Sequence, residues 1–173
     1  MYVSGHLAMG YLVAAGPAVG LRRPLDIRNA LLPALLGSVT PDIIDKPLRA
    51  LELIQYSRGL GHSLFFLALI YVVWKILAHR GARIARPFGY WTAGIAAHHF
   101  ADLTNDLFRG LEARGFIITA WPFWPITDAR TLAVQYDLGR HIRIHETYTS
   151  LEIGVYALTA AVIFASWYQQ RHR

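Results

Sequence analysis

The chain has 173 residues, of which 54% are hydrophobic and 16% are charged, and its formal net charge is +6. The length suits a single domain covering residues 1–173, and the charged share lies well below the roughly 25% of a typical soluble domain. Cysteine is absent, which excludes disulfides and thiolate metal ligands, so any metal site must use His, Asp, Glu or backbone oxygen.

Five apolar segments approach the roughly 20 residues that a helix needs to cross a bilayer. In chain order, the expected helices cover residues 3–21, 27–42, 61–79, 88–107 and 150–168. The first lacks the basic start of a signal peptide, so we expect it to be retained, and Asp26 is the expected N-cap of the second. The pattern predicts an all-α, polytopic membrane helix bundle of about five helices. A polar, aromatic extracytoplasmic segment, residues 108–149, precedes the last helix and contains the sequence WPFWP.

Positive charge is concentrated in three short segments between or after the apolar ones. These segments hold Arg22, Arg23 and Arg28; Arg80, Arg83 and Arg86; and Arg171 and Arg173. If the N-terminus lies outside, all three fall on one side, which the positive-inside rule makes cytoplasmic. We therefore expect a protein of the cytoplasmic (inner) membrane with an extracytoplasmic N-terminus and a cytoplasmic C-terminus. Because the basic charge sits at helix ends, no nucleic-acid partner is expected.

The same predicted topology places ionisable residues from five helix ends at one level near the outer face of the membrane. They are His6, Asp42, Asp45, His62, His98, Asp102 and Glu152. His98 and Asp102 are four residues apart and so share a helix face. Asp42 and Asp45 point the same way if their segment is helical, with Pro41 in the first turn. Ionisable groups at membrane depth cost roughly 2.5–3.5 kcal/mol each on insertion scales, so such a set needs a compensating partner.

A divalent metal ion supplies that compensation, and His with carboxylate suits zinc, with manganese or iron as further candidates. We expect one or two ions, held by His6, Asp42, Asp45, His62, His98 and Asp102. Asp45 is either a further ligand or the general base. Arg58 and Lys46 are expected to bind phosphate oxygens and stabilise developing charge, and the outer face implies that the site is extracytoplasmic.

Each residue also has a simpler explanation. His6 alone is typical of an interfacial residue, Asp42 can cap a helix, and Asp45 can pair with Lys46 or Arg49. His98 and Asp102 can form an ordinary buried hydrogen bond.

Four further ionisable residues lie outside the expected ligand set. His99 is expected to support the site or to pack, and Asp106 is expected to be solvated. His141 and His145 form another pair four residues apart, for which an amphipathic segment at the membrane surface is the favoured interpretation.

The motifs GSVTPDIIDKPL, RGLGHSLFF, GIAAHHFADLTND and WPFWP, with an early His6, resemble the YdjM-like membrane-bound metal-dependent hydrolases over roughly residues 4–125. That family is also described as LexA-regulated, and it is distantly similar to zinc-dependent phospholipase C. The resemblance matches its early His to His6, its Pro-Asp motif to Asp42, its His-Ser motif to His62 and Ser63, and its His-x-x-x-Asp motif to His98 and Asp102. Asp45 stands one residue later than in the commoner Pro-Asp-x-Asp form.

The predicted His/Asp cluster and the family resemblance together favour a membrane-embedded metal-dependent hydrolase that uses a metal-activated water to hydrolyse a phosphoester. Membrane lipid is the expected partner and a lipid is one possible substrate. Two alternatives remain: a metal or proton transporter that uses the intramembrane His and Asp residues, and a non-catalytic membrane scaffold with a structural metal. A cluster confined to one face argues against a pathway across the bilayer.

Overall fold

The computed structural model describes residues 2–54, 58–112, 117–119, 121–123, 125, 131–133 and 150–171. This part of the chain is predominantly helical, as expected. Its α-helices are α1 (Val3–Gly20), α2 (Leu32–Ala50), α3 (Leu64–His79), α4 (Ala85–Glu112) and α5 (Ser150–Arg171). A π-helical turn, η1 (Ile27–Leu31), leads into α2, and η2 (Trp121–Phe123) is a short 3₁₀ helix.

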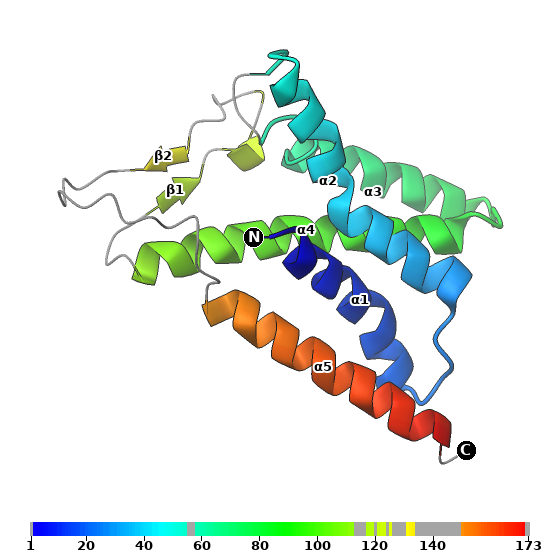
Figure 1. Cartoon of the computed structure of the whole chain (residues 1–173). Coiled ribbons are helices and arrows are strands. Elements are labelled where there is room, and N and C mark those ends of the chain that lie inside the picture. The colour runs from blue at the N-terminus through cyan, green and yellow to red at the C-terminus, as the bar shows by residue number, and fades with distance from the viewer. Residues whose placement is uncertain are drawn as a thin grey trace.

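The long helix α4 lies across the middle of the bundle, with α1 and α5 side by side on one flank (Figure 1). The helices α2 and α4 run in the same general direction and cross at an angle (Figure 1), because Asp26, just before η1, pairs with Arg86 at the start of α4, and Ser38 contacts His98 further along.

The directions of α1 and α5 follow from contacts at both of their ends. The backbone N–H of Tyr2 donates to Glu152 near their starts, and the side chain of Gln169 donates to the carbonyl of Val19 near their ends. These helices are therefore parallel. As the charge threading predicts, the starts of α1, α3 and α5 lie near the C-terminal halves of α2 and α4.

Local capping explains where two of the elements begin. The Asp26 carboxylate accepts the backbone N–H of Asn29 at 2.9 Å, which confirms the predicted N-cap. That N–H lowers the pKa of the Asp26 carboxyl, and the side chain of Asn29 reinforces the effect. Ser63 caps α3 in the same way by accepting the backbone N–H of Phe66 at 3.1 Å.

The prediction for the second helix was wrong at its C-terminal end. We expected it to stop at about residue 42, with Pro41 in a first turn only if the segment of Asp42 and Asp45 is helical, but α2 continues through Pro41 and Pro47 to Ala50. Each proline removes a helix hydrogen bond, yet α2 packs closely along α4. A Cβ added at Gly37 would meet the carbonyl oxygen of Trp91, so the two backbones touch there. We attribute the continued helix to this packing.

The segment before α5 contains a small sheet that the apolar pattern did not predict. Strands β1 (Ile117–Thr119) and β2 (Thr131–Ala133) pair antiparallel, with Ile117 opposite Ala133. The sheet lies beside the C-terminal half of α4 (Figure 1). His141 and His145 lie outside the described residues.

Among the described residues, α5 is the one helix long and apolar enough to cross a membrane, over Leu151–Arg171. The apolar helix α3 is shorter, at 16 residues. Both helices expose large apolar side chains, such as Leu69 at 61% and Phe164 at 63%. An apolar outer surface of this kind is typical of contact with a membrane or a partner.

Candidate metal centre

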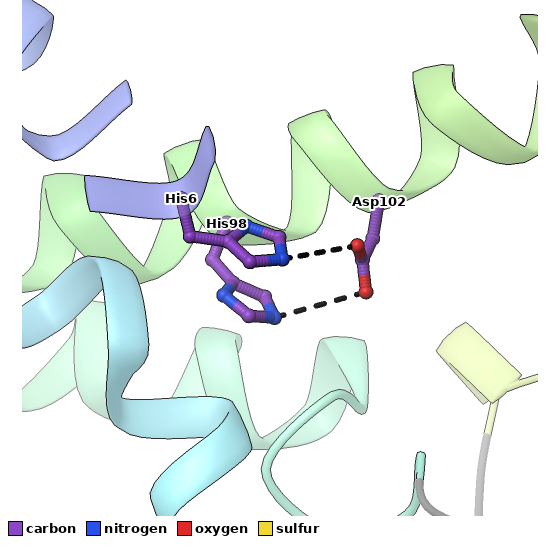
Figure 2. A group of neighbouring side chains, drawn as sticks. All are labelled: His6, His98 and Asp102. Atoms are coloured by element: carbon purple, nitrogen blue, oxygen red, sulfur yellow. Dashed lines mark ion pairs between the residues drawn. The ribbon is translucent and has the colours of Figure 1, made fainter. Parts of the chain in front are cut away.

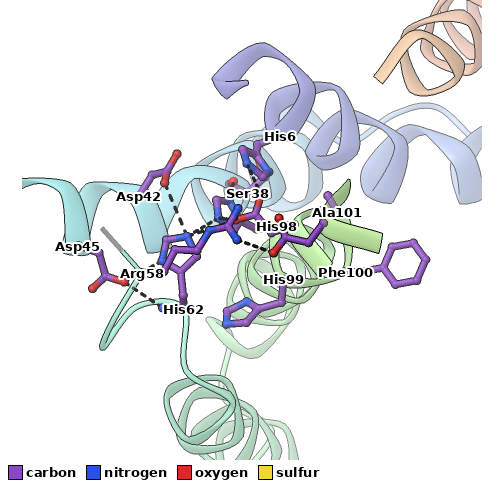
Figure 3. Close-up of polar contacts among 12 residues, drawn as sticks. His6, Ser38, Asp42, Asp45, Arg58, His62, His98, His99, Phe100 and Ala101 are labelled. Carbon is purple, nitrogen blue, oxygen red and sulfur yellow. Dashed lines mark hydrogen bonds and ion pairs between the residues drawn. The ribbon is translucent and has the colours of Figure 1, made fainter. Parts of the chain in front are cut away.

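Ionisable side chains from three helices and one loop meet inside the bundle (Figure 3). Helix α1 provides His6, α2 provides Asp42 and Asp45, the loop before α3 provides Arg58 and His62, and α4 provides His98 and Asp102. Five of them are at most 3% exposed: His6, Asp45, His62, His98 and Asp102. The structure thus brings together all the residues that the sequence suggested as metal ligands.

The ring of His98 is fixed by the backbone of α2. Its Nδ1 lies 2.7 Å from the carbonyl oxygen of Ser38. A carbonyl oxygen can only accept, so this ring nitrogen carries the proton and donates it. The neutral ring therefore presents the lone pair of its Nε2 to the cluster, which is the form that binds a metal.

His62 is fixed in the same manner by Asp45, whose Oδ2 lies 2.7 Å from the Nδ1 of His62. The Asp45 carboxylate also accepts the backbone N–H groups of Gly59, Gly61 and His62, at 2.8, 2.9 and 3.2 Å. Both of its oxygens are thus occupied. A carboxylate behind a ligating histidine holds the tautomer and the ring orientation, so Nε2 of His62 also directs a lone pair into the cluster.

This geometry corrects the expectation for Asp45. The sequence suggested a metal ligand or a general base, but its carboxylate faces the loop and His62 (Figure 3). It acts on the cluster through the ring of His62, and Asp42, one turn earlier, is the aspartate of α2 that reaches the ligand atoms.

Three candidate ligand atoms form a triangle of suitable size for one ion. The two Nε2 atoms of His62 and His98 lie 3.0 Å apart, and Oδ2 of Asp102 lies 3.5 and 3.7 Å from them. A tetrahedral zinc with bonds of about 2.0–2.1 Å separates its ligand atoms by about 3.3 Å. Oδ1 of Asp42 lies 3.7 Å from Nε2 of His62, and Asp42, His62 and His98 form one group of possible ligands, to which we add Asp102. These four residues fit a divalent cation.

His6 extends the cluster on the other side of His98 (Figure 2). The two rings stack with centroids 3.7 Å apart, and Nε2 of His6 lies 3.3 Å from Oδ1 of Asp102. Within the described part of the chain, the buried Nδ1 of His6 has no hydrogen-bond partner. His6, His98 and Asp102 form a second group of possible ligands, which shares the single free nitrogen of His98 with the first.

Arg58 closes the cluster from the loop between α2 and α3. Its guanidinium contacts Oδ2 of Asp102 at 3.1 Å and Oδ2 of Asp106 at 2.6 Å. Burial acts to lower the pKa of Arg58, but the two carboxylates, Asp102 first, outweigh it and raise the pKa above its usual value. The prediction that Asp106 is solvated was wrong, because this residue is 8% exposed and pairs with Arg58.

Lys46, the other predicted phosphate contact, lies at the surface. Its side chain is 54% exposed, and its Nζ lies 2.7 Å from Oδ2 of Asp42. Both predicted cations therefore contact a carboxylate that faces the candidate metal position.

Sequence reasoning missed the contributions of the backbone. The carbonyl of Ser38 and the N–H groups of Gly59 and Gly61 have no side-chain signature, although the Gly-x-Gly spacing before His62 was a weak sign of a tight loop. Glu152, which the sequence left unassigned, is fully buried and ties α5 to the start of α1 through Tyr2. His99 is buried beside the cluster and contacts the carbonyl of Ile95 at 2.9 Å.

A family model described as YdjM inner membrane protein matches residues 1–173. No curated protein and no solved structure matches the chain. The description of the family names a membrane and no reaction, and the similarity to zinc-dependent phospholipase C stays a prediction.

Proposed function

The chain belongs to the YdjM inner membrane protein family, and from this membership and its buried cluster we propose that it is a membrane-embedded, metal-dependent phosphoester hydrolase. The observation that carries the proposal is the approach of two histidine nitrogens, in His62 and His98, to 3.0 Å. Each ring has its proton committed to an acceptor on the far side. Two facing lone pairs repel each other, so this approach requires either a proton on one of the two nitrogens or a metal ion between them, and we propose the metal ion.

We assign one ion, most simply zinc, to His62, His98, Asp102 and Asp42. A single ion is favoured over two because His98 has one free nitrogen for both groups of ligands. His6 positions Asp102 from the other side through its contact with Oδ1. Only oxygen and nitrogen ligands are involved, which also suits manganese or iron.

A bound divalent ion lowers the pKa of water towards about 7 and polarises a phosphoryl oxygen. Three residues of the chain supply the other functions: binding phosphate, guiding the anion and orienting a metal ligand. Arg58 holds a partly buried positive charge beside Asp102, where a guanidinium can bind two phosphate oxygens. Lys46 stands at the exposed side of Asp42 and guides an anionic group towards the cluster. Asp45 keeps His62 in its ligating form.

For the membrane, we propose that all five helices lie in the bilayer with the cluster at the outer face. The exposed apolar side chains of α3 and α5 support this arrangement, as does the separation of the cluster from the arginine-rich end. A lipid phosphoester can reach such a site from within the bilayer, which makes a lipid the favoured substrate.

The test is to purify the protein in detergent, measure bound metal by mass spectrometry, and assay hydrolysis of bis(4-nitrophenyl) phosphate and of phospholipid. We expect bound zinc near one equivalent and metal-dependent hydrolysis. The variants His98→Ala and Asp102→Ala should lose both, whereas His79→Ala, an exposed histidine at the end of α3, should lose neither. Metal content unchanged in both cluster variants would overturn the ligand assignment. Tight metal without hydrolysis of any phosphoester would favour the scaffold, and metal flux into proteoliposomes would favour the transporter.

A further inference from the structure

At the end of the bundle away from the metal cluster, a cavity of about 100 Å³ opens between the end of α1, the start of η1 and the start of α4. Its apolar lining includes Ala18 and Leu21. Its polar lining consists of Arg23, Asp26, Arg86 and Tyr90. Neither the family description nor the proposed hydrolase assigns a role to this cavity.

The polar lining is positively charged. The carboxylate of Asp26 is already engaged, since it accepts hydrogen bonds from Asn29 at 2.9–3.3 Å and pairs with Arg86 at 3.2 Å. Arg86 is 63% exposed in its side chain, and Arg23 is exposed as well. The lining thus contains two guanidiniums and one carboxylate, which leaves the cavity with an excess positive charge.

The apolar surroundings distinguish this site from one for a free anion in water. Leu21, which lines the cavity, is 65% exposed, and Ile27 and Ile84, near Asp26 and Arg86 in sequence, are 59% and 58% exposed. Arginine recognises phosphate through paired hydrogen bonds. Basic pockets between membrane helices on the cytoplasmic side are suited to anionic lipid head groups.

We propose that this cavity binds the phosphate of an anionic phospholipid, with Arg23 and Arg86 contacting phosphate oxygens and the acyl chains lying along the exposed apolar side chains. The volume supports a head group alone, because sites for whole drug-sized ligands measure roughly 300–1,000 Å³. This inference requires the protein to lie in a membrane, but it is independent of the metal site and of hydrolysis.

The experiment measures phosphatidylglycerol binding to the detergent-purified protein by native mass spectrometry and by the rise in melting temperature. EDTA is present throughout, so that failure of the hydrolase proposal cannot affect the result. Arg23→Gln and Arg86→Gln each remove one proposed contact and should weaken lipid binding by roughly tenfold, the loss of one charge-assisted interaction. Arg83→Gln is the matched control, because it removes the same charge from the same end of the bundle outside the cavity.

Arg86→Lys addresses folding, since it keeps the positive charge near Asp26, and it should lose less binding than Arg86→Gln. An equal, modest loss in Arg23→Gln, Arg86→Gln and Arg83→Gln would mean that lipid responds to net charge only, and the site would be rejected. Stabilisation by inorganic phosphate as large as that by phosphatidylglycerol would also reject it, because the lipid would then contribute nothing beyond its phosphate.

Discussion

Both ends of the helix bundle place charged side chains beside apolar helices. The charges are buried at one end and exposed at the other. At the cluster end, Asp102 and His62 have side chains only 4% and 1% exposed. At the arginine-rich end, Arg86 and Asp26 have side chains 63% and 26% exposed. In the sequence, both ends are simply polar residues next to apolar runs.

The difference shows why one end demands specific partners and the other does not. A buried charge loses its hydration and must recover that free energy from neighbours inside the protein. Asp45 has four N–H donors and Arg58 has two carboxylates, so the position of each group is tightly determined. Exposed arginines keep their water, and ion pairs among them contribute little.

The largest expected effect is at Asp45. The variant Asp45→Ala leaves the N–H groups of Gly59, Gly61 and His62 without their acceptor, and removing one partner of a buried charged network costs about 3–5 kcal/mol. The free energy of unfolding, measured by denaturant titration in detergent micelles, should fall by that amount. Asp26→Ala, the matched change at the exposed end, should cause a clearly smaller fall. Equal losses at the two aspartates would remove the distinction between the ends.

Metal binding should stabilise the cluster end selectively. At free metal 100–1,000 times its dissociation constant, binding contributes about 2.7–4.1 kcal/mol to stability, so EDTA should lower the melting temperature of the wild-type protein. His98→Ala should abolish this response, whereas Arg83→Gln at the other end should preserve it. An EDTA response that survives in His98→Ala would place the ion elsewhere.

Helix α1 extends from the cluster end of the bundle to the arginine-rich end. A substitution at Gly10 measures how tightly the half of α1 nearest the metal cluster packs. A Cβ at this position would lie 2.6 Å from Oγ of Ser38 and 2.9 Å from the carbonyl oxygen of Ala34. Gly10→Ala should therefore cost about 1–3 kcal/mol, the usual effect of overpacking. It should also weaken metal binding, because a displaced Ser38 carbonyl no longer orients His98. Unaltered metal affinity would show that the ring of His98 does not depend on α2.

Much of this comparison could be predicted from the sequence, and the rest depends on contacts that no single segment encodes. Apolar runs located four of the five helices to within about five residues at each end but missed the last eight residues of α2. The charge pattern placed His6, His62 and His98 at one level. The roles of Asp45 and Asp106 could not be predicted, because both depend on the path of the loop between α2 and α3. Proline, a usual helix breaker, also concealed the continuation of α2, which is held by its packing on α4.

The smallest predicted effect is at Gly20, the last residue of α1 and the counterpart of Gly10 at the arginine-rich end. A Cβ added there meets nothing within 4 Å among the described residues, and the residue lies within a helix. Gly20→Ala should raise the free energy of unfolding by about 0.4–1 kcal/mol, because it restricts the unfolded chain without straining the folded one. Denaturant titration beside Gly10→Ala gives the comparison directly, since the two substitutions are chemically identical. A loss of stability in Gly20→Ala would mean that this end is packed as tightly as the cluster, contrary to the contrast between the two ends.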